Sequence, residues 1–306
     1  MKALLKNIGV RRASYEQIIT MKALVMRCAI LVTLTHLWLF AGPGQVYARE
    51  QETAVPDPCS GPSALLAILD RPTVSDSACA IPQGKFVLEM GVQRANLRGP
   101  GGGTADNYPQ AEVRIGLPGR NEFVLLPPNY NRQRAGAASG PSAQDITGYS
   151  AVTFGFKHEL GYNRYWLGAV EALITLPSGG RAFGSRGPGV AVNGIAAYAL
   201  TEQTGLSLQL GVSSQSEPAL AGGGRFTSLV SNFVTTWQPA DRLQFYGEIY
   251  GQSSTGPGKG AGYNADCGVQ YLITPFWEVD LEGGMRLGGG LGGITHYFGA
   301  GIGFYF

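Results

Sequence analysis

Charged residues are scarce in this chain. Asp, Glu, Lys and Arg make up 14% of its 306 residues, and the formal net charge is +2. The first 48 residues hold six of the basic residues and one acidic residue, which leaves 17 basic and 20 acidic residues in the remainder. A slightly acidic chain without a basic run argues against a nucleic-acid partner.

Long amphipathic helices are also lacking. After residue 48, no stretch repeats apolar residues at the spacing of a helix face, whereas glycine is abundant at 46 residues. From Lys85 onward the apolar residues alternate with small or polar ones, as they do along a half-buried strand. The sequence therefore predicts an all-β protein.

The N-terminus has the features of a secretory signal peptide. Lys22 and Arg27 precede the apolar run "CAILVTLTHLWLFA", and "VYA" supplies small residues for cleavage after Ala48. A transmembrane anchor is the alternative, but the uncharged run is short and contains His36. We predict a signal peptide over 1–48. Because "MKAL" occurs twice, translation is expected to start at Met21.

Cysteine is rare, with four residues in the chain. Cys59 and Cys79 follow the signal, and an exported chain meets an oxidising compartment in which a disulfide persists. We predict a Cys59–Cys79 disulfide, with two buried thiols as the alternative. Residues 49–84 are accordingly expected to form a short periplasmic N-terminal segment.

A repeated unit of about ten alternating residues fills the chain from Lys85 to Phe306. The breaks between units alternate between short ones such as "PGRN" and long ones such as "SSQSEPALAGGGR". This pattern is typical of an up-and-down transmembrane β-barrel with tight turns at one end and long loops at the other. The segments begin near Lys85, Tyr108, Glu122, Tyr149, Tyr165, Val190, Leu206, Phe226, Leu243, Tyr263, Trp277 and Thr295, which predicts about 12 antiparallel strands over residues 85–306.

Charged side chains keep to one face of each predicted strand, which fixes the strand register. Those expected to line the lumen are Glu89, Glu112, Arg114, Glu122, Lys157, Glu159, Glu171, Glu248, Asp266, Glu278, Asp280 and Glu282. Because carboxylates dominate, an open lumen is expected to prefer cations. The last three could suggest a metal site, but a spacing of two along a strand separates carboxylates by about 7 Å, so no metal is expected.

Large aromatic residues lie on the opposite, apolar face near the short turns. They are Trp166, Tyr198, Trp237, Tyr271 and Trp277. A soluble β-sandwich would show the same alternation. A row of amphipathic rings at one rim is instead typical of a membrane interface, and we predict a membrane girdle.

The sequence ends in "THYFGAGIGFYF", in which Phe304 and Phe306 share the apolar face. A terminal strand of this kind would close a barrel against its first strand, which removes exposed sheet edges. Terminal aromatics on that face also resemble the C-terminal signal of Gram-negative outer-membrane barrels. That resemblance implies recognition of Phe304 and Phe306 by the barrel-assembly machinery.

Three stretches carry a resemblance to one family. "CAIPQGKFVLEMGVQR", "YPQAEVRIGLPGRNEFVLL" and "TGYSAVTFGFKHEL" are similar to the opening strands of an outer-membrane transporter family linked to meta-pathway phenol degradation. The resemblance implies a porin-like channel for passive uptake of small molecules, aromatic or otherwise hydrophobic. It also implies an outer-membrane location among lipid and lipopolysaccharide.

Catalytic motifs are not evident. "TGPGKGAG" lacks the glycine and Ser/Thr offsets of a phosphate loop, so no cofactor is expected. A barrel phospholipase would need a Ser/His pair, but His158 and His296 fall at opposite rims of the predicted barrel. The sequence therefore favours a non-enzymatic channel, with a structural or adhesive barrel as the alternative.

Overall fold

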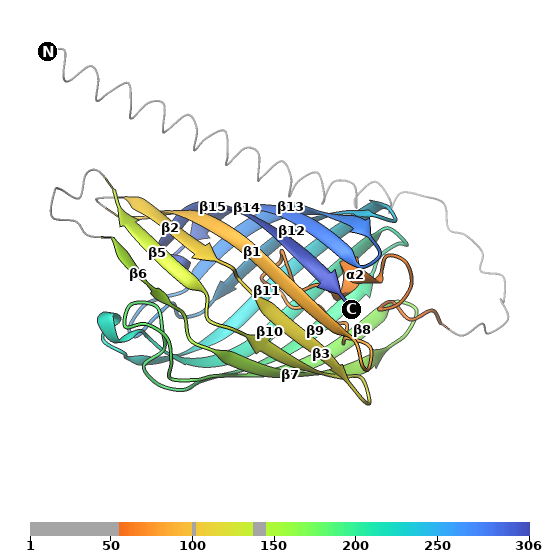
Figure 1. Cartoon of the computed structure of the whole chain (residues 1–306), viewed down its shortest axis with the longest axis horizontal. Coiled ribbons are helices and arrows are strands. Elements are labelled where there is room, and N and C mark those ends of the chain that lie inside the picture. Colours follow the sequence, from red (N-terminus) through yellow and green to blue (C-terminus); the bar gives the residue numbers. More distant parts are fainter. Residues whose placement is uncertain (1–54, 100–101, 137–144) are drawn as a thin grey trace, which may run out of the picture.

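Antiparallel strands account for most of the chain that follows Lys85. The computed structural model describes residues 55–99, 102–136 and 145–306, so the predicted signal peptide over 1–48 and the start at Met21 lie outside the described residues. Fifteen strands follow one another around a single sheet, and the last one pairs with the first. Figure 1 shows the resulting barrel, with the strands tilted relative to its long axis.

The strands combine into a barrel of 12. β2 and β3 are two pieces of one strand, as are β4 with β5 and β6 with β7. Their bounds are β1 Phe86–Leu97, β2 Gly103–Tyr108, β3 Glu112–Leu117, β4 Asn121–Leu126, β5 Tyr130–Ala135, β6 Ile146–Tyr149, β7 Thr153–Tyr162, β8 Trp166–Thr175, β9 Gly189–Ala199, β10 Thr204–Ser216, β11 Arg225–Ala240, β12 Leu243–Gln252, β13 Gly262–Thr274, β14 Trp277–Gly288 and β15 Ile294–Tyr305. The predicted fold class, an antiparallel barrel of about 12 strands, is confirmed.

Three strands differ from the sequence prediction in length. The Gly-rich stretches after β1 and after β5 were expected to be loops, but β2, β5 and β6 extend the barrel wall beyond them. Each long strand is interrupted once, at 109–111, 127–129 and 150–152. Proline has no N–H for the ladder, and side chains fill the gaps, since Asn129 N donates to Ser150 Oγ at 2.8 Å. Pro109 and the pair Pro127–Pro128 therefore interrupt two of these strands without ending them, whereas the interruption at 150–152 contains no proline.

Closure joins β1 to β15 in antiparallel register, from Val87 opposite Tyr305 to Asn96 opposite His296, with a register shift before Leu97 pairs with Ile294. At the short-turn end, Phe86 and Phe306 exchange two backbone hydrogen bonds of 3.2 and 2.9 Å. Their rings stack at a centroid distance of 4.5 Å. Phe306 thus completes the seam between the first and last strands.

The outer face of the wall is apolar. Leu229, Leu281 and Val92 are at least half exposed there, at 63%, 60% and 55%. Aromatic rings concentrate near the short turns: Trp166 packs on Tyr198 at 4.6 Å, and Trp277 packs on Phe304 at 5.0 Å. The alternation predicted from the sequence therefore sends apolar side chains outward and charged ones inward.

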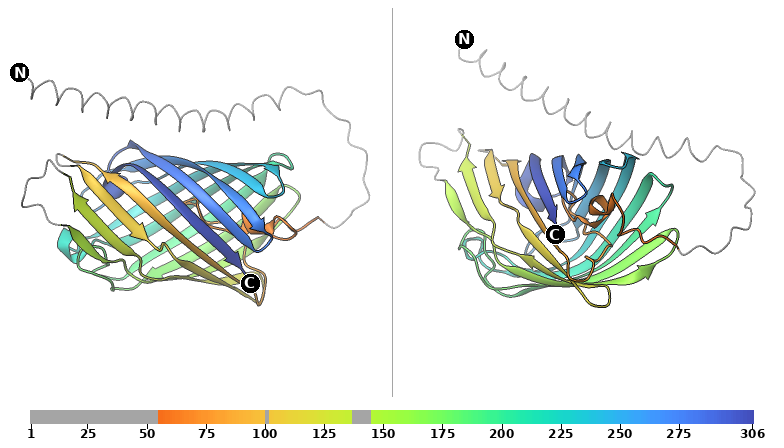
Figure 2. Two further views of the ribbon diagram at one scale, coloured as in Figure 1. Left: turned by 45° about the horizontal axis from the view of Figure 1, so that its top comes forward. Right: turned by 45° about the vertical axis from the view of Figure 1, so that its right-hand side comes forward.

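The N-terminal segment lies inside the barrel. The sequence places it in the periplasm as a separate piece, whereas the structure threads residues 55–84 through the short-turn end into the ring of strands (Figure 2). It contains one short helix, α2 (Ala64–Ile68). Among the described residues, no helix is long and apolar enough to cross a membrane. We call residues 55–84 the plug.

An apolar core fixes the plug against the wall at this end. Leu65, Leu66 and Ile68 of α2 are at most 3% exposed, and they cluster with wall residues that include Leu167 and Leu272. The Cys59–Cys79 disulfide ties the two arms of the plug together. Burying three such side chains contributes several kcal/mol, roughly 1.5–3 for each, relative to a solvated plug.

The seam between β1 and β15 predicts a specific effect of Phe306. Phe306→Ala removes the stack on Phe86 at the closing edge, so the yield of assembled barrel should fall several-fold. Folded barrel is measured by its faster gel migration before boiling. Leu220→Ala changes an exposed apolar residue in the 3-10 turn Ala219–Ala221 and is the matched control. Equal yields from the two variants would contradict this role for Phe306.

Candidate functional site

Inward carboxylates of the wall bind the backbone of the plug. Glu89 accepts the N–H of Arg71 at 2.6 Å and that of Asp70 at 3.2 Å. Glu248 accepts the N–H groups of Val74 and Ser75 at 2.7 and 2.8 Å. The irregular plug has no strand partner for these groups, so the carboxylates satisfy N–H donors that would otherwise be buried without acceptors.

Further along the plug, the same kind of contact recurs. Glu122 accepts the N–H of Ile81 at 2.8 Å, and Glu159 accepts that of Ala80 at 3.3 Å. These residues belong to the set that the sequence predicts to line an open lumen. In the structure they face the interior, but a docked segment of the chain occupies the space in front of them.

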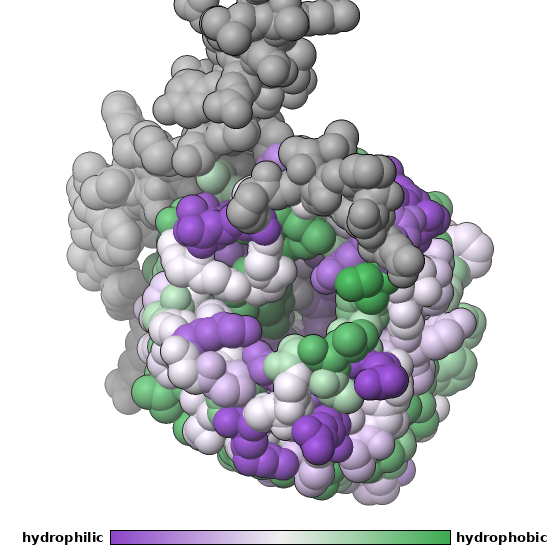
Figure 3. All heavy atoms as spheres, turned by 90° about the vertical axis from the view of Figure 1, so that its left-hand side faces the viewer, coloured by the Kyte–Doolittle hydropathy of each residue, from purple (hydrophilic) through white to green (hydrophobic). Residues whose placement is uncertain are grey.

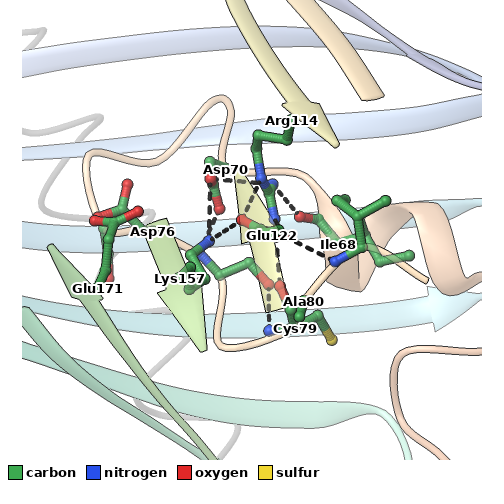
Figure 4. Close-up of polar contacts among 12 residues, drawn as sticks. Ile68, Asp70, Asp76, Cys79, Ala80, Arg114, Glu122, Lys157 and Glu171 are labelled. Atoms are coloured by element: carbon green, nitrogen blue, oxygen red, sulfur yellow. Dashed lines mark hydrogen bonds and ion pairs between the residues drawn. The ribbon is translucent and has the colours of Figure 1, made fainter. Parts of the chain in front are cut away.

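A buried ion cluster connects three strands to the plug (Figure 4). Asp70 of the plug lies between Arg114 of β3, at 3.0 Å, and Lys157 of β7, at 3.4 Å. Glu122 of β4 pairs with the same two bases, at 2.9 and 3.1 Å. The Arg114, Glu122 and Lys157 side chains are wholly buried. Glu89 of β1 adds a third carboxylate, 3.4 Å from Arg114. Three carboxylates thus compensate two buried bases, and one of them comes from the plug.

Arg71 of the plug binds the acidic stretch of β14. Its Nη2 lies 3.1 Å from Asp280 Oδ1 and 3.8 Å from Glu282 Oε1. Gly91 of β1 and Gly301 of β15 sit directly beneath the guanidinium, where a Cβ on either residue would collide with it. These inward glycines therefore leave space for the plug.

Four more of the predicted lumen residues are Glu171, Asp266, Glu278 and Glu112. Glu171 contacts Asn193 Nδ2 at 3.1 Å and faces Asp76 of the plug (Figure 4). Asp266 accepts the hydroxyl of Tyr297. Glu278 is fully buried and neither of its oxygens has a hydrogen-bond partner, while Glu112 is half-buried. All four face the interior, so the structure brings the whole set onto the inner surface of one wall.

Two cavities flank one turn of the plug. The inner one, of about 320 Å³, lies toward the short turns and is lined in part by Thr73, Ser75 and Asp76. The outer one, of about 500 Å³, opens toward the long loops and is lined in part by Val74. Residues 73–76 therefore stand between the two cavities, and we call them the plug turn.

Hydrogen bonds from three wall strands hold the plug turn. Gln209 of β10 accepts the N–H of Asp76 at 2.6 Å and donates to Asp76 Oδ2 at 2.9 Å. Asn232 of β11 donates to Val74 O at 3.4 Å, and Glu248 of β12 holds the next N–H groups, as described above. Gln209 and Glu248 each make at least two of these hydrogen bonds, and each hydrogen bond contributes about 0.5–1.5 kcal/mol, or 1.5–3 where a charge is involved.

His158 and His296 lie near opposite ends of the barrel. His158 bonds to Asn121 near a short turn, and His296 bonds to Asn96 and Thr295 near a long loop. Neither has a serine among its hydrogen-bond partners in the described part of the chain. No group of three metal-binding side chains occurs among the described residues either.

Solved structures with this fold are outer-membrane barrels. An outer-membrane channel from Pseudomonas putida F1 is 12% identical, with a TM-score of 0.55, over 75% of this chain and 98% of that one. The NanC porin, at 12% identity, and the KdgM porin, at 10%, match 72% of this chain with TM-scores of 0.46 and 0.44, covering 98% and 99% of their own lengths. The first of these similarities identifies the fold as that of an outer-membrane β-barrel.

Sequence comparison adds no family. No protein-family model matches the chain, and no curated protein sequence does. The link to phenol degradation, taken from the resemblance of the opening strands, therefore stays a prediction.

The sequence did not indicate the plug residues as functional. Asp70, Arg71 and Asp76 lie in a short stretch without periodicity, and their contacts are with strands far along the chain. The available signal was indirect. Inward carboxylates outnumber inward bases, so additional positive charge or N–H donors had to come from elsewhere, and the plug supplies both.

The ion cluster predicts a large effect of losing Asp70. Asp70→Ala leaves Arg114 and Lys157 with one carboxylate fewer, which should weaken plug docking by about 3–5 kcal/mol. Amide hydrogen exchange over residues 65–81 should then accelerate by about 10²–10⁴-fold. Asp145→Ala breaks the exposed pair with Arg132 and should change the same rates by less than about fivefold. Similar exchange in both variants would contradict the role of the cluster.

The plug turn predicts a pH dependence. Burial, and next the facing Glu171, raise the pKa of Asp76 to about 8 from the ordinary 3.8. Lys157 acts in the opposite direction, and Gln209 also bonds to the carboxyl. Between pH 4 and 8 the docked form binds more protons than the undocked form, so docking should weaken as pH rises through this window and then level off.

Hydrogen exchange of residues 73–76 measures this effect, with at most about a tenfold change per pH unit. Asp76→Asn removes the titrating group and should flatten the profile, after correction for the intrinsic pH dependence of exchange. An unchanged profile in this variant would assign the titration to another group.

Proposed function

We propose that the chain is an outer-membrane channel for the passive uptake of small molecules, with the plug turn as its narrowest point. The observation that carries the proposal is the pair of cavities inside one closed barrel, both of which are lined in part by residues 73–76. A solute that entered at the long loops would reach the inner cavity once this turn moved aside. The similarity in fold to the Pseudomonas putida F1 channel supports the proposal.

The outer membrane is the proposed location. The apolar outer face and the rings of Trp166, Tyr198, Trp237, Tyr271 and Trp277 fit a lipid bilayer with one aromatic interface. Lipid and lipopolysaccharide would then surround the barrel. Recognition of Phe304 and Phe306 by the barrel-assembly machinery, and export through a signal peptide over 1–48, belong to the same proposal.

Small hydrophobic or aromatic compounds are the proposed substrates. The inner cavity supports this choice because Leu66, Leu69, Leu167 and Val234 contribute to its lining. Apolar side chains favour solutes that bury apolar surface, at about 25 cal/mol for each Å².

A structural or adhesive barrel remains the second candidate. The favouring observation is that the plug is held by buried ion pairs, backbone hydrogen bonds and an apolar core. A barrel whose plug never moves would present its loops to partners without transporting anything.

Conductance in a planar bilayer tests the proposal. Wild-type protein should give small, cation-preferring steps. Arg71→Ala should increase the conductance several-fold, because the plug loses its contact with β14. It should also strengthen the cation preference, because Asp280 and Glu282 lose their counter-charge. Reversal potentials in a salt gradient measure that preference.

Arg286→Ala is the control, since this residue donates to Gly289 O at the end of β14 and does not contact the plug. Folding of both variants is verified by heat-dependent gel migration. Absence of conductance in both the wild type and Arg71→Ala would favour the adhesive alternative. Anion preference would show that the carboxylates do not line the path.

A further inference from the structure

The outer cavity has a defined chemical lining. Figure 3 looks onto the long-loop end and shows the surface hollowed at its centre, with both hydrophilic and hydrophobic residues around the hollow. Its volume of about 500 Å³ is in the range of small-molecule sites. Seven carboxamide side chains contribute to the wall: Gln93, Asn107, Asn131, Gln133, Asn232, Gln252 and Asn264.

The two charged residues of this lining, Asp106 and Arg132, both have ion-pair partners. Asp106 lies 3.1 Å from Arg94 and 3.2 Å from Arg134. Arg132 pairs with Asp145 at 2.6 Å. The other lining residues are uncharged. A neutral solute is therefore favoured over an ion, which would have to displace one of these partners.

A chain of hydrogen bonds orients Asn264. Tyr297 donates its hydroxyl to Asp266, Tyr250 donates its own to Tyr297, and Asn264 Nδ2 donates to Tyr250 Oη at 3.4 Å. Because the Tyr250 proton is already used, its oxygen can only accept a hydrogen bond from Asn264. The amide of Asn264 must therefore keep its NH2 toward Tyr250 and its carbonyl turned away from it.

That carbonyl is left without a partner. Asn264 is 2% exposed, and its Oδ1 makes no hydrogen bond. The Oδ1 of Asn107, on the same cavity, is likewise buried and unpartnered. Buried acceptors of this kind are costly unless a donor reaches them, so they indicate a ligand that supplies one.

Apolar groups surround these acceptors. Ala95, Phe183, Leu291 and Ile294 line the cavity together with the ring of Tyr250. Such a surface accommodates the hydrocarbon part of a solute, while the acceptors contact its polar end.

We propose that the outer cavity is a binding site for a neutral small molecule that carries a hydroxyl group on an apolar body, with the hydroxyl donating to Asn264 Oδ1. The site rests on the proposed channel function and specifies the chemistry of its solute. Binding is expected to be weak, with a Kd on the order of 1 mM, because a site along a channel must also release its solute.

Benzyl alcohol and benzyl methyl ether test the donor requirement, since the ether replaces the hydroxyl proton by a methyl group. Binding to the full-length barrel in micelles is measured by saturation-transfer NMR, with empty micelles subtracted. The alcohol should bind about tenfold tighter than the ether, the effect expected when a buried acceptor loses its donor. Equal affinities would overturn the proposal.

Variants locate the site. Asn264→Leu should abolish the preference for the alcohol, whereas Asn121→Leu, which alters an amide near the opposite rim, should keep it. Tyr250→Phe frees the Asn264 amide to turn and present its NH2, so the alcohol-to-ether ratio should fall while the ether binds better. A preference unaffected by Asn264→Leu, in a variant that retains heat-dependent migration, would place binding elsewhere.

Benzylammonium tests the charge argument. It should bind no better than the alcohol. Tighter binding of benzylammonium would show that the site prefers a cation and would overturn the proposal of a neutral ligand. These measurements are independent of conductance. A barrel that binds the alcohol but never conducts would refute the channel function and retain the binding site. A barrel that conducts without preferring the alcohol would retain the channel function and refute the binding site.

Discussion

Compensation of buried charge inside the barrel is the constraint on which the rest of the structure depends. Arg114 and Lys157 are completely buried, and each requires an acidic partner because an isolated ion in such a place would cost several kcal/mol or more. The wall offers Glu122 and Glu89, but these carboxylates also accept N–H groups from the plug. Asp70 adds a carboxylate that contacts both bases, so the plug contributes to the charge compensation as well as to the hydrogen bonding of the wall carboxylates.

The alternation of strand residues made much of this wall predictable. A period of two sends Glu278, Asp280 and Glu282 to one face and Trp277 to the other, whatever the tertiary contacts are. The closed barrel, its approximate strand number and the inward set of charges follow from this local rule. The Cys59–Cys79 disulfide was predicted from the expected export to an oxidising compartment, and the structure contains that bond.

What could not be predicted has a different physical origin. Arg71 and Asp280 are 209 residues apart, and no periodicity in the plug indicates which strand it meets. The Gly-rich stretches beside β2 and β5 resembled loops because glycine and proline ordinarily interrupt strands. At the separate interruption between β4 and β5, Asn129 donates its N–H to Ser150 Oγ, a tertiary contact that composition does not reveal. Asn264 appeared to be an ordinary polar residue until its neighbours fixed the direction of its amide.

The contacts of the plug are unevenly distributed, and this bears on how a channel of the proposed kind would open. Ion pairs and apolar packing hold residues 65–71 and 79–81, whereas residues 73–76 are held mainly by hydrogen bonds to Gln209, Asn232 and Glu248. Local openings in proteins occur where few strong contacts must break. In the proposed channel, movement of the plug turn alone would leave Asp70 in contact with its buried bases. A solute would then pass without release of the whole plug, and the compensation of charge in the wall would be preserved.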